Sequence, residues 1–319
     1  MKWRLIILGG ICGSFLPFIL FGRPTDAAVV QVHGLSVSPA IEQLVVNSGQ
    51  QTVSFNCLIT NNTNSTLDLA LSAQDFTALN NISGSINFLP NSAPNSTYGL
   101  ADWIRFNNDT IQLGPHISQL VPVTIINTEN LAPGGHYAAI KFTASASLSS
   151  SSENRVSANE VISTLVFLTS SGHVVQSVQM SPLQQSWLTL QMPTSAHLVF
   201  KNIGNTQTAP QGLVTIDGPF HTAVARGLIN VGSGLVLPAT ARLYNVPLTS
   251  EHAFTYPGIY TLKVSYQAAG SQTVMTVTKH FLYINEPLFI AVVAVIVITL
   301  LWLIRRYGLR QIYILRRKA

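Results

Sequence analysis

The chain has 319 residues, of which 47% are hydrophobic and only 9% are charged, and its formal net charge is +5. This length allows two ordinary domains plus targeting segments, and a composition rich in Thr, Ser, Val and Asn favours strands and turns over helices. The positive charge lies at the two ends, because residues 29–286 hold 8 basic and 11 acidic residues. The middle of the chain therefore has no basic surface of the kind that binds nucleic acid.

The N-terminus has the three parts of a secretory signal. Lys2 and Arg4 form a charged start, 5–21 is an apolar run, and "PTDAA" offers small residues for cleavage. This pattern predicts a signal peptide over residues 1–28 and export of the chain from residue 29 onward. An uncleaved anchor helix is the alternative.

A first group of strand-like runs covers 29–172, which we predict to be an extracellular β-sandwich. "QTVSFNCLITN" and "NSTLDLALSAQDF" alternate apolar and polar residues on either side of an Asn/Thr-rich turn, and we expect them to form a hairpin. "NEVISTLVFLTSSG" (159–172) is nearly continuous in apolar residues, as in a strand that is buried on both faces. Cys57 falls on the apolar side of its run and is expected in the core.

A second group, over 173–285, repeats the order of the first. A Pro-Gly pair stands shortly before Tyr137 in "APGGHYAAIKF" and again before Tyr260 in "PGIYTLKVSY". Both tyrosines occupy the place where sandwich folds use a Tyr hydroxyl to brace a corner. We therefore predict an all-β protein with two tandem immunoglobulin-like antiparallel β-sandwich domains.

The C-terminus predicts a membrane anchor. Residues 286–304 contain an uncharged apolar run long enough to cross a bilayer as a helix, and 305–319 form a basic tail with six Lys/Arg. Positive charge beside a span marks the cytoplasmic side. The expected location is the cell membrane, with a single pass, an extracellular N-terminal region and a cytoplasmic tail.

This order of segments, with "LSVSPAIEQLVVNSGQQTVSFNCLITNNTNSTLDLALS" opening the first domain and "LAPGGHYAAIKF" as its late strand, resembles the WxL-interacting proteins of Gram-positive bacterial surfaces. The resemblance implies a non-enzymatic anchor. It also implies a first domain that binds other surface proteins and a second domain that contacts host proteins.

The sequence offers no catalytic or metal-binding motif. The eight histidines are scattered, with His136 expected as an exposed turn residue, and the acidic residues are isolated. No nucleophile-elbow, zinc or phosphate-loop motif is present. We therefore expect no enzymatic activity, no cofactor, no bound metal, no nucleic-acid partner and no small-molecule substrate.

The remaining candidate function is recognition of a surface protein or a cell-envelope polymer. Residues 76–106 form the longest insertion between clear strands, rich in Asn, Ser and Gly around Phe88, Tyr98 and Trp103, which we predict as partner-binding residues. Trp103 in a core strand is the alternative, as is recognition through an unprotected edge strand.

The expected function is thus a non-catalytic, membrane-anchored binding or adhesion protein that tethers its partner to the cell. A structural spacer or accessory subunit of an envelope complex is one alternative. A single-pass glycoprotein receptor is another, because five Asn-x-Ser/Thr sequons lie in the first domain, at Asn61, Asn64, Asn81, Asn95 and Asn108.

Overall fold

The computed structural model describes most of the chain between the N-terminal segment and the C-terminal tail. The described residues are 30–32, 34–90, 97–127, 131–145, 160–220, 223–251 and 256–316. The predicted signal peptide (1–28), the Ser-rich stretch between the strands at 134–145 and 160–170, and the last three residues lie outside these ranges.

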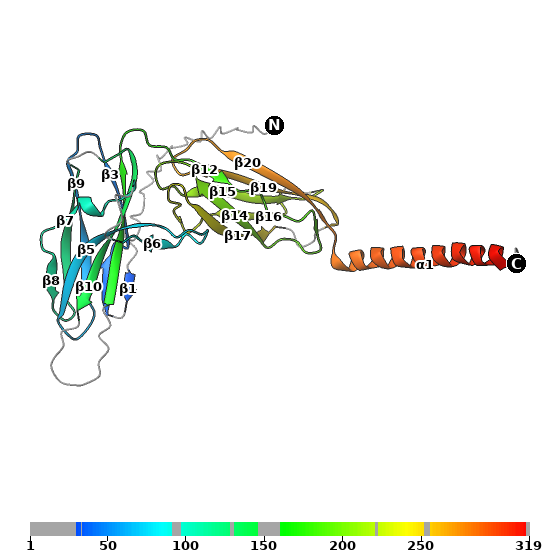
Figure 1. Ribbon diagram of the computed structural model, residues 1–319, viewed down its shortest axis with the longest axis horizontal. Coiled ribbons are helices and arrows are strands. Elements are labelled where there is room, and N and C mark those ends of the chain that lie inside the picture. Colours follow the sequence, from blue (N-terminus) through cyan, green and yellow to red (C-terminus); the bar gives the residue numbers. More distant parts are fainter. Residues whose placement is uncertain are drawn as a thin grey trace, which may run out of the picture.

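The described chain is built from strands, followed by one long helix (Figure 1). The strands up to residue 170 are β1 (Val30–Val32), β2 (Leu35–Ser38), β3 (Ile41–Val46), β4 (Thr52–Asn61), β5 (Leu67–Ala78), β6 (Ile86–Phe88), β7 (Ile104–Phe106), β8 (Thr110–Leu113), β9 (Ser118–Ile126), β10 (Gly134–Ser145) and β11 (Glu160–Ser170), with a short 3-10 helix at Ala101–Trp103. The later elements are β12 (Val178–Met180), β13 (Leu188–Thr189), β14 (Ser195–Asn202), β15 (Pro210–Asp217), β16 (Ala225–Ile229), β17 (Ala241–Pro247), β18 (Thr249–Ser250), β19 (Gly258–Ala268), β20 (Met275–Tyr283) and α1 (Glu286–Arg316).

These strands form four sheets in two pairs. The first sheet pair has the orders β1-β2-β4-β9-β7 and β3-β11-β10-β5-β6, with β8 also bonded to β5. The second sheet pair has the orders β12-β14-β17 and β13-β20-β19-β15-β16-β18. The prediction of a mostly β protein with one C-terminal apolar helix is confirmed, while the domain boundaries stay a prediction.

Each sheet pair encloses its own hydrophobic core, and a third cluster lies between the pairs. The first core includes Ile59 and Phe142, and the second includes Phe200 and Val264, all without solvent exposure. The third, which we call the junction cluster, consists of Phe76, Tyr137, Ala139 and Phe167 from the first pair and Leu237 from the second. Burial of apolar surface is the main favourable contribution to folding, so this cluster also holds the two pairs against each other.

The prediction that β4 and β5 form a hairpin is wrong, because the two strands lie in different sheets. β4 pairs with β9, whereas β5 pairs with β10. The chain crosses between the sheets at Asn61, which has no exposed surface and whose Nδ2 donates to three backbone carbonyls. Its Oδ1 accepts from the Thr63 backbone N–H at 2.9 Å. A side chain that satisfies local backbone groups in this way stabilises a turn without any strand pairing.

The second sheet pair uses the same device at the corresponding place. Asn202, also without exposed surface, donates from Nδ2 to the carbonyls of Thr206 at 2.7 Å and Val236 at 2.8 Å, and its Oδ1 accepts from the Gly204 N–H at 2.8 Å. β14 and β15, on either side of this turn, again lie in different sheets. The internal repeat in the sequence thus corresponds to a repeated sheet-crossing turn.

The last helix meets the test for a membrane span. Among the described residues, Glu286–Arg306 is the one helical segment long and apolar enough to cross a bilayer, and its spanning window is not buried against the rest of the protein. Figure 1 shows α1 projecting from the end of the second sheet pair. The helix continues to Arg316, beyond the predicted end of the span at 304.

Candidate functional site

The three residues predicted to bind a partner have different environments. Phe88 lies in β6 and is 41% exposed. Tyr98 packs on the junction cluster, with its ring centroid 6.2 Å from that of Tyr137. Trp103 ends the 3-10 helix and packs against the first core. Two of the three therefore have packing roles, and partner binding by this set stays a prediction.

The segment that carries Phe88 reaches across to the second sheet pair. The Leu243 N–H donates to the Ile82 carbonyl at 2.7 Å, so the turn before β6 pairs with edge strand β17. Gly84 lies so close to Arg242 that a Cβ at this position would overlap its guanidinium. Figure 1 shows β6 and this turn extending from the first pair toward β17. This hairpin, residues 78–88, bridges the two pairs.

Hydrogen bonds join the two sheet pairs on the other side of the junction cluster. The Gly135 N–H donates to the Asn205 carbonyl at 2.8 Å, and the Tyr137 hydroxyl donates to Gln207 Oε1 at 3.1 Å. Gln207 Nε2 in turn donates to Thr169 Oγ1 at 3.1 Å. Buried polar groups that are satisfied across an interface fix its geometry, so these hydrogen bonds hold the two sheet pairs in one relative position.

A cleft of about 350 Å³ opens beside these contacts, and we call it the junction cleft. Its walls come from both sheet pairs and hold no charged residue and no aromatic ring. The lining residues are Gln43, Leu44, Val45, Thr169, Gln176, Gln207, Thr208, Ala209, Ser233, Leu235 and Ala269.

One group in the cleft wall is unsatisfied. Thr208 is 2% exposed, and its Oγ1 has no hydrogen-bond partner among the described residues. A buried hydroxyl without a partner costs about 1–3 kcal/mol, so such a group calls for an explanation. The carboxamides of Gln43 and Gln176 are exposed and also have no partner within the described part of the chain. Because the Thr208 oxygen has almost no accessible surface, the groups that the cleft presents to a ligand and leaves unused are the Gln43 and Gln176 carboxamides.

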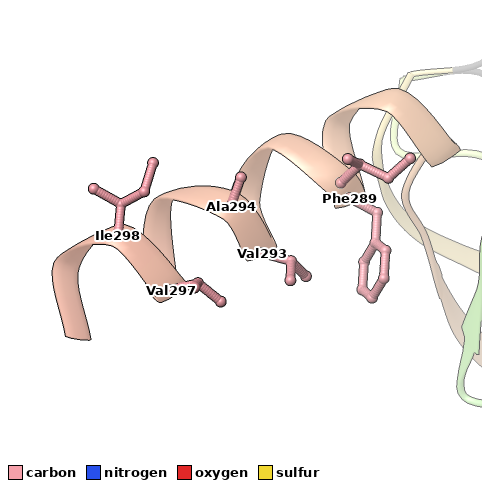
Figure 2. A pocket seen from close by; sticks show the side chains of 6 residues that line it. Phe289, Val293, Ala294, Val297 and Ile298 are labelled. Carbon is pink, nitrogen blue, oxygen red and sulfur yellow. The ribbon is translucent and has the colours of Figure 1, made fainter. Parts of the chain in front are cut away.

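The other hollow of similar size, about 390 Å³, lies along α1 and has a different character (Figure 2). Its lining is entirely apolar and includes Phe289, Val293 and Ile298. Figure 2 shows these side chains pointing outward from several sides of one helix, with no second wall. This is the surface that lipid chains cover in a membrane span, and it offers no group that could orient a ligand.

The described titratable residues form no metal-binding cluster and include one buried thiol. Within the described ranges no three His, Cys, Asp or Glu side chains are placed to hold a metal ion. Cys57 is buried as predicted, and this burial raises the pKa of its thiol to about 11 although its Sγ lies 3.7 Å from Thr164 Oγ1. A thiol with this pKa is protonated at neutral pH and is a poor nucleophile.

The expectation of an exposed His136 is wrong. The residue is 4% exposed, and its two ring nitrogens lie 3.2 Å from the Gly99 carbonyl and 2.8 Å from the Ala132 carbonyl. Gly134 and Gly135 dock against the Asn205 turn, so the Pro-Gly turn lies at the junction instead of in solvent. His136 is a packing residue of that turn.

Comparison with known proteins adds a distant likeness. No protein-family model and no curated protein matches the sequence. A solved chain from the chaperone–tip adhesin complex of CFA/I fimbriae biogenesis is 8% identical with a TM-score of 0.43, covering 76% of this chain and 97% of that one.

Two further structures are similar at the same level. The class 5 fimbriae chaperone CfaA is 11% identical, with a TM-score of 0.39 and coverage of 77% and 98%. The CsuC–CsuE chaperone–tip adhesion subunit pre-assembly complex of Acinetobacter baumannii gives 11% identity, a TM-score of 0.35 and coverage of 68% and 89%. Scores at this level assign no activity and no partner to the present chain.

Proposed function

We propose that this chain is a non-catalytic, membrane-anchored binding protein with two immunoglobulin-like sandwiches, which holds a surface protein or an envelope polymer outside the cell. The observation that carries the proposal is the junction cleft, whose exposed Gln43 and Gln176 carboxamides have no hydrogen-bond partner among the described residues. Binding sites commonly lie where two domains meet, with a few polar groups that fix orientation.

The two ends of the chain support an outward-facing location. The apolar part of α1 is followed by six basic residues, and the N-terminus has the composition of an export signal. Positive charge next to a span favours its cytoplasmic side, which supports a location of both sheet pairs outside the cell. A WxL-interacting protein would have the same arrangement, and membership of that family is part of the proposal.

The hairpin gives the spacer alternative a specific basis. Because Ile82 accepts a hydrogen bond from Leu243, the hairpin 78–88, which is the first part of the predicted recognition insertion, is attached to the second sheet pair. A stiff rod would serve a spacer equally well. The receptor alternative loses one of its sequons, because Asn61 is completely buried and its amide is used in three hydrogen bonds.

Affinity capture on the full chain tests the proposal. The chain, inserted in lipid nanodiscs, is exposed to an extract of the cell envelope in which it is native, and retained proteins and polymers are identified after washing. We expect retention of a specific macromolecule by wild-type nanodiscs and none by empty nanodiscs. Retention of nothing specific would contradict the binding function and favour the spacer.

Two variants then locate the binding surface. Phe88→Ser removes the exposed ring of the predicted recognition insertion, whereas Val45→Lys puts a charge into the wall of the junction cleft. Loss of retention in Phe88→Ser alone would support the sequence-based site. Loss in Val45→Lys alone would support the cleft.

A further inference from the structure

The edge strands of the four sheets differ in how well they are protected from pairing with a further strand. Most edge strands in the described chain have two to four residues, and short edges resist unwanted pairing. The seven-residue β17 lies at an edge, but its Leu243 N–H is occupied by the hairpin. β3 has six residues, "IEQLVV", with no Lys or Pro, and pairs with β11 on one side only. Residues 275–281 of β20 are also unpaired on one side, but that stretch carries Lys279, and a Lys on an edge strand discourages pairing; β3 is an open edge without such protection.

The register of β3 shows which of its backbone groups are free. β3 runs parallel to β11. The Leu165 N–H of β11 donates to the Ala40 carbonyl, and the N–H of Ser171, the residue after β11, donates to the Val46 carbonyl, both at 2.9 Å. Because the N–H and C=O of one residue point to the same side and alternate along a strand, even-numbered residues face β11. Ile41, Gln43 and Val45 therefore direct their N–H and C=O groups away from β11, and these groups have no partner within the described residues.

The same three residues have their side chains on the outer face of the sheet. Ile41 is 47% exposed and Val45 is 62% exposed. Gln43 lies opposite Phe167 in the register, and Phe167 belongs to the junction cluster. A strand added to β3 would extend the six-stranded sheet and continue an apolar surface that already packs against the second sheet pair.

The junction cleft lies beside this edge. Gln43 and Val45 form part of one wall, while Thr208 and Leu235 belong to the opposite wall, from the second sheet pair. With no charged side chain in the lining, the cleft gives no complementary charge to an ionic ligand. With no aromatic ring, it has no flat platform for stacking. Amides and hydroxyls that can both donate and accept match a peptide backbone and uncharged side chains.

We propose that the junction cleft and the free edge of β3 together bind an extended, uncharged peptide segment of the partner protein, which adds as a strand next to Ile41–Val46. This inference rests on the proposed binding function and specifies its partner as a polypeptide. Backbone hydrogen bonds to Ile41, Gln43 and Val45 hold the segment, and its polar groups bond to the exposed Gln43 and Gln176 carboxamides. Such strand addition takes affinity from the backbone and specificity from alternate side chains.

The test uses a defined peptide and the full chain in nanodiscs. The probe is a fluorescein-labelled nine-residue peptide of alternating valine and serine or threonine with a blocked C-terminus, and its binding is measured by fluorescence polarisation. Two further versions carry backbone N-methyl groups at alternate residues, one on the odd set and one on the even set. Since only one set can face β3, we expect one version to bind at least tenfold more weakly and the other to keep its affinity within about twofold.

Point variants give an independent readout. Val45→Lys puts a charge on the open edge and is expected to abolish binding, whereas Leu228→Lys, at a position that is also 62% exposed but lies outside the cleft, leaves it unchanged. Thr208→Val is expected to leave binding unchanged, because its inaccessible hydroxyl does not contact the peptide, while the melting temperature stays level or rises because an unsatisfied buried hydroxyl is removed.

Raising the salt concentration from about 50 to about 500 mM is expected to change the affinity less than about twofold. Equal binding by the two N-methylated versions, or no binding of the unmodified peptide up to about 1 mM, would overturn strand addition. If wild-type nanodiscs retain an envelope component but Val45→Lys retains it equally, the proposed function survives and only the peptide site fails.

Discussion

Gly134, the first residue of β10, gives a direct test of how the two sheet pairs are held together. Its φ is +126°, a conformation that L side chains rarely adopt, and a Cβ built there would lie 2.5 Å from the Asn205 carbonyl oxygen. Gly134→Ala therefore adds backbone strain of about 1–3 kcal/mol. It also pushes the Asn205 turn away, at the cost of the Gly135–Asn205 hydrogen bond, worth about 1 kcal/mol. The expected loss is about 2–4 kcal/mol, a factor of about 30 to 700 in the closed-to-open ratio of the junction.

Hydrogen exchange read by mass spectrometry can detect this change in the full chain. Peptides that cover 131–145 and 203–209 should exchange faster in Gly134→Ala, while peptides from the two separate cores keep their protection. The control is Gly49→Ala, because Gly49 also has a positive φ, +79°, but nothing lies within 4 Å of its built Cβ. Equal protection at 203–209 in wild type and Gly134→Ala would show that the Pro-Gly turn does not hold the junction.

Three further changes test the separate cores. Asn202→Ala removes three buried hydrogen bonds and should lower the free energy of unfolding by about 3 kcal/mol, as measured by thermal unfolding in detergent. The control Asn62→Ala, at the surface, should lower it by less than about 0.5 kcal/mol. Burial raises the pKa of Cys57 from 9.0 to about 11, so only the unfolded thiol ionises between these pH values. The free energy of unfolding should therefore fall by about 1.4 kcal/mol per pH unit in this range. Cys57→Ala should remove that part of the slope in pH-dependent unfolding curves. Tyr260→Phe loses the hydroxyl bond to the Tyr256 carbonyl at 2.7 Å and should cost about 1 kcal/mol in the same unfolding assay, with no change in exchange at the junction.

The repeated Pro-Gly-Tyr element shows what local sequence could predict. Tyr260 is a corner tyrosine as expected, since its hydroxyl bonds to a backbone carbonyl four residues upstream. Tyr137 follows the same kind of turn, yet its hydroxyl bonds to Gln207, 70 residues later in the chain. Turn and strand chemistry is local, so the sequence predicts it in both copies. The partner of a buried hydroxyl is set by tertiary packing, which one sequence does not reveal.

The prediction of a β4–β5 hairpin failed, and the prediction of a recognition site in 76–106 stayed open, for a related reason. An Asn-centred turn between two amphipathic runs suits a hairpin and a sheet crossing equally well, because alternation fixes the buried face of a strand but not its neighbour. The polar composition of 76–106 is typical of a recognition loop. However, the Ile82 backbone and the Ile86 side chain attach its first part to the second sheet pair.

The junction cleft could not have been predicted at all. Val45 and Thr208 belong to strands and turns with ordinary composition, and no motif links them. The alternation in "IEQLVV" indicates a strand, but only the sheet order shows that this strand lies at an edge. The signal that identifies the site is a row of unpaired backbone groups at a sheet edge beside a cleft, and this property exists only in the folded chain.

The cleft depends on the junction, since its walls come from different sheet pairs, and this dependence can be measured. A peptide that bridges both walls binds only the closed form, so its apparent dissociation constant is the intrinsic value divided by the closed fraction. Gly134→Ala touches no residue of the cleft lining. It should therefore weaken binding of the valine–serine/threonine peptide only as far as it makes the open form common, and hydrogen exchange at 203–209 should report that opening. Val45→Lys should abolish binding while the junction stays closed. Weaker binding in Gly134→Ala with an unopened junction would mean that the peptide contacts the Pro-Gly turn itself, and the site would have to be placed there instead of along β3.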